Sequence, residues 1–325
     1  MQNEMFENKI DLSIVANSIV KIKDEVRKVI VGQETMVELL LASILADGHV
    51  LIEGVPGVAK TLTSKVLART ISADFSRIQF TPDLMPSDVT GVSVFNQKST
   101  EFDFKKGPIF SNIVLIDEIN RAPAKTQAAL FEVMEERQVT VDGNTYLMDP
   151  PFMILATQNP IDQEGTYKLP EAQLDRFLFK IVVRYPQADE EFLILKDAHL
   201  NGSRADLSRV NAVLSKQEIK EIRAAVQKVH VEDHLIRYIT SIIQETRNNA
   251  SLYLGASPRA SVAILRASKA IAAIRGRDFV TPEDIQEVTA PVLEHRVVVT
   301  AEKEMEGVTV SDVLKQIIKK IEVPR

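Results

Sequence analysis

The chain has 325 residues, a formal net charge of −6 and no cysteine. Its length exceeds the usual size of one domain and predicts a large domain with a smaller one, while the absence of cysteine excludes disulfide and thiolate chemistry. No apolar run reaches the length of a membrane span, and the first residues lack the basic-then-apolar form of a signal peptide, so we expect a cytoplasmic protein without membrane insertion.

Residues 9–30 predict an amphipathic helix. Apolar side chains recur there at near-helical spacing, at Ile10, Ile14, Ile19, Ile22, Val26 and Ile30. The helix leads into Val31, Gly32 and Gln33. By itself, Gly32 is compatible with a plain helix C-cap.

A glycine-rich segment at residues 54–61 lies between a predicted strand, residues 50–52, and a predicted helix, residues 62–70. Backbone N–H groups of such a turn converge on phosphate oxygens, and the helix dipole adds positive potential. We therefore expect a phosphate-binding loop. The candidate nucleotide-binding residues are Gly54, Val55, Pro56, Gly57, Val58, Ala59, Lys60, Thr61 and Leu62.

Three positions of this loop carry its predicted chemistry. Lys60 supplies a point charge for the outer phosphates of ATP, and the Thr61 hydroxyl is a candidate ligand for Mg²⁺. Ala59 stands where the usual pattern has a second glycine. Alanine is acceptable there if it belongs to the first turn of the helix, with right-handed dihedrals. The alternative is an ordinary strand-turn-helix with incidental glycines.

Residues 75–80 predict a further strand, and two β-hairpins follow it along the chain. Residues 91–95 and 101–105 alternate apolar with polar side chains across a polar turn. Residues 139–141 and 145–147 flank an Asp-Gly-Asn turn and follow a predicted helix.

Residues 113–116 form an apolar run of β type that ends in Asp117 and Glu118. Such a strand suits burial on both faces of a parallel sheet. At its carboxyl end Asp117 can hold Mg²⁺ through the ion's hydration shell, and Glu118 can polarise the water that attacks the γ-phosphate. Either acid alone could cap a surface helix, but the pair downstream of a phosphate loop predicts a catalytic role.

Asn159 follows another buried strand, residues 153–157, and precedes Pro160. We expect this strand to lie beside the one that carries Asp117. A neutral amide there can orient the lytic water or sense the γ-phosphate. The alternative role of Asn159 is an ordinary turn before Pro160.

Arg176 precedes a fourth strand of this set, residues 179–183. A guanidinium near the carboxyl edge of the sheet could reach a nucleotide in a neighbouring subunit and offset charge on the transferring phosphoryl group. The alternative is a surface ion pair with Asp175 or Glu171.

Beyond Pro186 the sequence predicts helices without strand patterns, at residues 190–200, 215–229, 232–248, 258–275 and 281–289, with a last helix near Ser311. Residues 281–284 (TPED) are typical of a helix start. The composition beyond Pro186 is that of an all-helical lid domain. Arg259 lies near another helix start, from which it could move onto phosphate as the lid moves. The alternative for Arg259 is a solvent-exposed arginine.

Five motifs in succession, GVPGVAKT, IVLIDEINRAP, VMEERQVTVDG, ATQNP and LPEAQLDRF, resemble the MoxR group of AAA+ ATPases. In this group the phosphate loop ends in Ala-Lys-Thr, where the usual pattern has Gly-Lys-Thr. The resemblance extends from about Ile30 to the carboxyl terminus. It implies an α/β P-loop fold, with a parallel sheet between helices and β-hairpin inserts, followed by a small all-α lid. It also implies a ring, most often a hexamer, with Mg²⁺ and ATP between subunits.

The resemblance assigns roles to several of these residues. Asn159 is sensor 1, Arg176 the arginine finger and Arg259 sensor 2, and the segment of Val31, Gly32 and Gln33 borders the adenine pocket. The first hairpin corresponds to the helix-2 insert, whose tip, residues 96–100, faces the ring axis and a client. The expected divisions are a helical segment at residues 1–30, a nucleotide-binding domain at 31–187 and a lid at 188–325.

The expected function is that of an ATPase that remodels proteins in the manner of a chaperone. By resemblance, its partners are copies of itself and a protein client or a partner with a von Willebrand factor A domain. One alternative is a nucleic-acid motor, which predicts basic, aromatic-bearing surfaces. The negative net charge argues against nucleic acid. Another alternative is a non-hydrolysing regulatory scaffold, and a third is a subunit of a metal-inserting chelatase.

Overall fold

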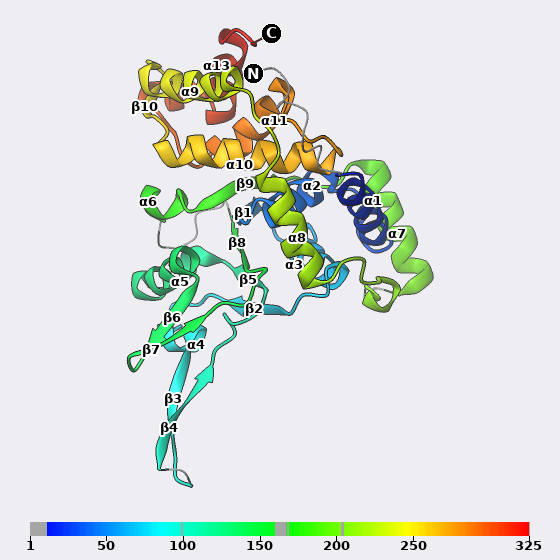
Figure 1. The fold of residues 1–325 in the computed structure, drawn as a ribbon, viewed down its shortest axis with the longest axis vertical. Helices are drawn as coiled ribbons and strands as arrows, with labels where there is room; N and C mark the ends of the chain where they lie inside the picture. The colour runs from blue at the N-terminus through cyan, green and yellow to red at the C-terminus, as the bar shows by residue number, and fades with distance from the viewer. Residues whose placement is uncertain (1–11, 99, 160–166, 168, 203–204, 325) are drawn as a thin grey trace, which may run out of the picture.

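The computed structural model describes residues 12–98, 100–159, 167, 169–202 and 205–324. The α/β part of the chain consists of a five-stranded sheet with helices packed on it, and a helical part lies against one end of that sheet. The first hairpin projects from the opposite end (Figure 1). The arrangement confirms the predicted parallel sheet with hairpin inserts and a helical lid.

The sheet is parallel, with strand order β2-β5-β8-β1-β9. Its strands are β1 (His49–Gly54), β2 (Phe75–Gln79), β5 (Ile113–Asp117), β8 (Met153–Gln158) and β9 (Phe177–Val183). Ile116 pairs with Ala156, and Ile52 pairs with Thr157, so the three central strands end together. This register brings the segments that follow β1, β5 and β8 to one edge of the sheet, as predicted for Asn159 beside the strand of Asp117.

Alternate residues of the central strands enter two separate cores. Val50 and Ile52 belong to one core, which also contains residues from helices α1 (Ser13–Arg27), α2 and α3, whereas Leu51 belongs to the other, with helix α5. The helices are α2 (Glu34–Leu45), α3 (Lys60–Thr70) and α5 (Ala124–Glu136). Burial on both faces explains why these strands are apolar throughout rather than at every second position.

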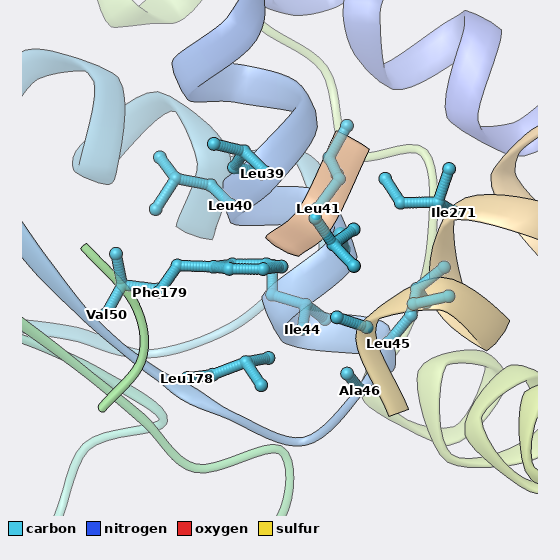
Figure 2. Close-up of a cluster of buried hydrophobic side chains, with 14 of the residues drawn as sticks. Leu39, Leu40, Leu41, Ile44, Leu45, Ala46, Val50, Leu178, Phe179 and Ile271 are labelled. Carbon is cyan, nitrogen blue, oxygen red and sulfur yellow. The ribbon is translucent and has the colours of Figure 1, made fainter. Parts of the chain in front are cut away.

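Helix α2 joins the sheet to the helical part. Figure 2 shows side chains of this helix, including Leu41 and Ile44, between Phe179 of β9 and Ile271 of the lid helix α10 (Pro258–Ile274). The larger core is therefore continuous from the sheet into the lid.

Helix α1 (Ser13–Arg27) is shorter than the predicted helix, and residues 9–11, including Ile10, lie outside the described residues. Val15 is buried on its inner face, whereas Ile14 is 67% exposed, so Ile14 does not belong to the apolar face that the predicted spacing gave it. The buried face follows a strict helical period from Val15 that Ile14 does not share. The C-cap of α1 is Lys28, so the alternative role of Gly32 as its C-cap is also wrong.

Both predicted hairpins are present. The first comprises β3 (Gly91–Asn96) and β4 (Glu101–Lys106) after α4 (Pro86–Thr90), and the second comprises β6 (Gln138–Val141) and β7 (Asn144–Leu147). Asp142 and Gly143 have φ of 50° and 78°, as a two-residue hairpin turn with right-handed strand twist requires. Ser99, in the tip predicted to face a client, lies outside the described residues.

After β9 the chain contains α7 (Ala188–Asn201), α8 (Lys216–Gln227), α9 (Asp233–Asn248), α10 (Pro258–Ile274), α11 (Pro282–Leu293), α12 (Ala301–Met305) and α13 (Val310–Lys320). Of these, α7 and α8 lie beside α1 and α3, whereas α9, α10, α11 and α13 gather at the end of the sheet (Figure 1). Short elements are α6 (Glu171–Leu174) and two 3-10 turns, Ile119–Arg121 and Leu207–Arg209. The expectation of no strands here was wrong, because β10 (Leu252–Leu254) pairs with β11 (Val298–Val299). Strands this short carry no readable alternation. Among the described residues, no helix is long and apolar enough to cross a membrane.

Candidate functional site

A cavity of about 380 Å³ opens at the carboxyl edge of the sheet. The loop after β1, the end of β2 and the ends of β5 and β8 all contribute to its wall. The lining residues are Gly54, Pro56, Gly57, Val58, Ala59, Lys60, Thr61, Leu62, Arg77, Gln79, Asp117, Glu118, Thr157 and Asn159. The structure thus brings together the phosphate loop, the acidic pair and Asn159, although Pro160 lies outside the described residues.

The backbone of the loop departs from the prediction at Ala59. This residue has φ of 59° and ψ of 18°, so it is left-handed, and the expectation of right-handed dihedrals was wrong. The reason is that α3 begins one residue later, at Lys60, and Ala59 is its N-cap. Alternation of left-handed and right-handed residues turns successive N–H groups into a concavity suited to anions. At Gly57, with φ of 88°, the space that a Cβ would occupy is open.

Lys60 brings its positive charge into the cavity. Its Nζ donates a hydrogen bond to the Gly54 carbonyl oxygen at 2.5 Å. Burial lowers the pKa of Lys60, while the nearby carboxylates of Asp117, Glu118 and Glu53 oppose that shift. The amine is therefore held at the start of the loop by a neutral acceptor that phosphate oxygens can replace.

Asp117 is buried at the end of β5 and is held on both carboxylate oxygens. Arg77 Nε donates to its Oδ2 at 2.5 Å, and the Thr157 hydroxyl donates to its Oδ1 at 3.1 Å. The Thr157 hydroxyl also accepts a hydrogen bond from the Glu118 N–H at 3.0 Å. Thr157 therefore fixes the end of β5 against β8.

Glu118 is held in a strained backbone conformation, with φ of 56°. Its Oε2 accepts from Gln79 Nε2 at 3.1 Å and pairs with Arg121 Nε at 2.9 Å. Left-handed dihedrals in a residue with a Cβ are uncommon and cluster at functional sites. Glu118 is the N-cap of the 3-10 turn Ile119–Arg121, but its side chain makes no capping hydrogen bond and instead lines the cavity.

Three residues of this wall were not predicted from the sequence: Arg77, Gln79 and Thr157. Arg77 and Gln79 lie two positions apart on β2, where Gln79 pairs with Asp117. A signal was present, because two polar residues at a spacing of two, near the carboxyl end of a strand in a parallel sheet, share one face.

The residues present fit Mg²⁺ bound with nucleotide phosphates. Thr61 and Asp117 offer a hydroxyl and a carboxylate, the hard oxygen ligands that Mg²⁺ prefers. Among the described residues there is no group of three or more His, Cys, Asp and Glu that could hold a metal ion. The pair of Thr61 and Asp117 therefore suits a Mg²⁺ ion that keeps several water ligands and binds together with phosphate, rather than an ion enclosed by protein ligands.

Arg176 and Arg259 line a different cavity, of about 540 Å³. Both contact the carboxylate of Glu135 on α5, Arg176 through Nη1 to Oε2 at 2.7 Å and Arg259 through Nη2 to Oε1 at 3.3 Å. The alternative pairing of Arg176 with Asp175 or Glu171 was wrong. The Arg259 side chain is 56% exposed, as its alternative predicted, and also pairs with Glu135. Within one chain, neither arginine lines the cavity of the phosphate loop.

Val31, Gly32 and Gln33 lie between α1 and α2 and do not line the phosphate cavity. Gln33 Nε2 donates to the Arg184 carbonyl oxygen at 3.3 Å, just beyond β9. A Cβ at Gly32 would overlap the carboxylate of Glu190 on α7. The segment therefore lies beside the end of β9 and the first turn of α7.

Comparison with known proteins gives two family matches. Residues 49–179 match the model of the ATPase family associated with various cellular activities (AAA), and residues 244–317 match the AAA lid domain.

Relatives match over nearly the whole chain. The chain is 46% identical to the uncharacterized protein YeaC of Bacillus subtilis, over 94% of each chain. It is 43% identical to Chaperone MoxR1 of Mycobacterium tuberculosis, over 93% of this chain and 81% of that protein. The crystal structure of a candidate ATPase from Cytophaga hutchinsonii matches with a TM-score of 0.89 at 42% identity, over 97% of each chain.

Proposed function

The chain belongs to the MoxR family of AAA+ ATPases, and from this premise we propose that it binds Mg²⁺ and ATP at the phosphate-loop cavity and hydrolyses the nucleotide. One observation carries the proposal. Lys60, Thr61, Asp117, Glu118 and Asn159 come from three separate segments of the chain and line one cavity. Together they supply a positive charge for the phosphates, ligands for the metal ion and groups that activate water.

Each residue has a distinct proposed task. The loop from Gly54 to Leu62 holds the phosphates, and Lys60 exchanges the Gly54 carbonyl for phosphate oxygens. Glu118 accepts a proton from the attacking water, and Asn159 orients that water. Thr61 and Asp117 would hold Mg²⁺, which supplies charge neutralisation on the phosphates. The segment of Val31, Gly32 and Gln33 is proposed to border adenine.

We propose that Arg176 and Arg259 both act in trans. A developing negative charge on the transferring phosphoryl group needs a cation close to it. In one chain both arginines line a cavity separate from the phosphate loop, which supports their use by a neighbouring subunit. A closed ring, proposed to be a hexamer, supplies such a neighbour at every site.

The proposed use of hydrolysis is protein remodelling. One relative carries the name Chaperone MoxR1, and this supports a chaperone-like role in assembling or activating protein complexes. The proposed partner is a protein client or a protein with a von Willebrand factor A domain, and the proposed location is the cytoplasm. The division into a segment at residues 1–30, a nucleotide domain at 31–187 and a lid at 188–325 also remains a prediction.

The test is steady-state ATP hydrolysis across a series of protein concentrations. The native chain is compared with Glu118→Gln and Arg176→Ala. Loss of activity in both variants, with specific activity of the native chain rising as subunits associate, would support a shared site. A native chain that binds ATP but hydrolyses none under any condition of assembly would overturn the proposal.

A further inference from the structure

A residue of the lid forms hydrogen bonds with the backbone on both sides of Arg176. Arg296, at the end of the segment after α11, has a side chain only 3% exposed. Its Nη2 donates to the carbonyl oxygens of Asp175 at 2.9 Å and Phe177 at 2.6 Å, the two residues that flank Arg176. Its Nε donates to Asp175 Oδ1 at 2.7 Å. The backbone position of Arg176 is therefore set by a buried arginine of the lid.

A second lid residue holds the same carboxylate. The Ser257 hydroxyl donates to Asp175 Oδ2 at 2.9 Å, and Ser257 is the N-cap of α10, two residues before Arg259. Asp175 thus connects the backbone of Arg176 to the helix that carries Arg259. Both carboxylate oxygens of Asp175 are committed to the lid.

Glu135 completes the connection at the level of the guanidinium groups. Its two carboxylate oxygens each take one arginine, Oε2 taking Arg176 and Oε1 taking Arg259. A single carboxylate therefore sets the separation of the two guanidinium groups. Arg176 Nε is buried and has no hydrogen-bond partner among the described residues, so the Arg176 guanidinium keeps a donor that the chain does not use.

We propose that Glu135 and the Asp175–Arg296 pair are positioning residues for the two trans-acting arginines. Asp175 and Arg296 fix the Arg176 backbone to the lid, and Glu135 fixes the two guanidinium groups relative to each other. This inference rests on the proposed function, in which Arg176 and Arg259 serve the nucleotide of a neighbouring subunit. The neighbour's phosphates then meet two cations whose spacing is already set.

Energetics favour a positioning role over a purely structural one. The Asp175–Arg296 pair has a modest expected effect on stability, because the desolvation energy that its burial costs is offset by its attraction and by hydrogen bonds from Arg296 to backbone carbonyl oxygens. Correct placement, by contrast, has a large kinetic value, because an error of about 1 Å in a catalytic group can lower a rate by about 100-fold.

The first measurement uses Glu135→Gln, since the amide is neutral and has one acceptor oxygen, so it cannot hold the two arginines on separate oxygens as the carboxylate does. Glu135 is 42% exposed on its side chain, so we expect the variant to fold. The expected result is a fall in kcat on the order of tenfold, with KM for ATP changed less than about twofold, because the variant's own phosphate loop is intact. The matched control is Glu136→Gln, one residue along α5 and outside both ion pairs, which should keep native kcat.

A subunit-mixing experiment separates action in trans from general damage. A Glu118→Gln subunit cannot hydrolyse its own ATP, but its Arg176 and Arg259 are correctly placed. A neighbouring Glu135→Gln subunit has an intact phosphate-loop site, which then receives those two arginines. We expect the mixture to hydrolyse ATP faster than the sum of its separate components. Asp175→Asn, whose amide weakens the grip of Arg296, should show the same rescue, and thermal unfolding of each variant alone monitors its folding.

The control mixture of Glu118→Gln with Arg176→Ala tests action in trans separately from positioning by Glu135. If this mixture gains no activity, action in trans fails, and the positioning inference fails with it. If it gains activity but the mixture with Glu135→Gln does not, only the positioning inference is overturned. A native or raised kcat in Glu135→Gln alone would likewise overturn it, since Glu135 would then be dispensable or would merely compete with phosphate.

Discussion

Two residues at the phosphate cavity, Ala59 and Glu118, have left-handed backbone conformations. An L-residue with a Cβ is less stable there by about 1–2 kcal/mol than in a right-handed turn. Both conformations place functional groups, since Ala59 shapes the loop before Lys60 and Glu118 carries the proposed base. Strain of this kind is compatible with a site whose geometry is imposed by the surrounding fold.

Replacement of Ala59 by glycine should therefore stabilise the chain. Glycine removes the steric cost of the left-handed conformation, while its greater freedom in the unfolded chain offsets about 0.4–1 kcal/mol. We expect Ala59→Gly to raise the free energy of unfolding by about 0.5–1 kcal/mol, measured as a higher midpoint of urea unfolding at an unchanged slope. Ala128→Gly, in the right-handed helix α5, should lower it by about 1 kcal/mol. A lower midpoint for Ala59→Gly would contradict the conformational argument.

Among the elements, helix α11 shows how one buried acid secures a helix start. Asp284 has no exposed surface and accepts a hydrogen bond from the Thr281 N–H at 2.9 Å. Arg275 and Arg277 donate to the same carboxylate at 2.9 Å and 2.6 Å. Burial alone would raise the pKa of Asp284, but hydrogen bonds from Arg277 and Thr281 outweigh it and lower that pKa.

Loss of the Asp284 charge should destabilise the lid strongly. Asp284→Asn keeps the shape of the side chain but removes the buried counter-ion of Arg277 and one of two carboxylates that Arg275 contacts, the other being Glu287. Breaking a buried pair in this way costs about 3–5 kcal/mol. The expected result is a large drop in the unfolding midpoint. Glu283→Gln changes a neighbouring exposed acid and should cost less than about 1 kcal/mol. Similar effects in the two variants would show that the buried network does not stabilise α11.

At the scale of the whole molecule, two buried histidines link folding to pH. Burial, reinforced by nearby Arg137, lowers the pKa of His49 to about 3, and its ring lies between the Met134 carbonyl and the Ile154 N–H. Burial, reinforced by Arg296, also lowers the pKa of His295 well below its usual value. Both rings are therefore neutral in the folded chain at pH values where an unfolded chain would protonate them.

Stability should fall as pH decreases from about 6.5 toward 3, because the unfolded state binds these protons first. Each histidine contributes a slope of about 1.4 kcal/mol per pH unit within that window. His49→Gln should remove about that much of the slope, measured by urea unfolding between pH 5 and 6, where most carboxylates stay ionised. Replacement of the exposed His234 by glutamine should leave the slope unchanged. An unchanged slope in His49→Gln would show that His49 does not set it.

Much of the fold and part of the candidate site could be predicted from sequence. The strands of the sheet, both hairpins and the phosphate loop were found because runs of apolar residues and turns of glycine are local signals. The pairing of Asp117 with Glu118 after an apolar strand was equally local. These features depend on residues within a few positions of one another.

Features that depend on distant segments were decided only by the tertiary structure. Arg77 and Gln79 became part of the phosphate cavity because β2 pairs with β5. Glu135 and Arg176 are 41 residues apart in sequence. They became partners because α5 packs against the start of β9, where Phe131 contacts Phe177. The left-handed conformation of Ala59 and the β10–β11 ribbon also escaped prediction. Local patterns specify elements and their chemistry, whereas side-chain partners across the fold are selected by packing, which one sequence does not display.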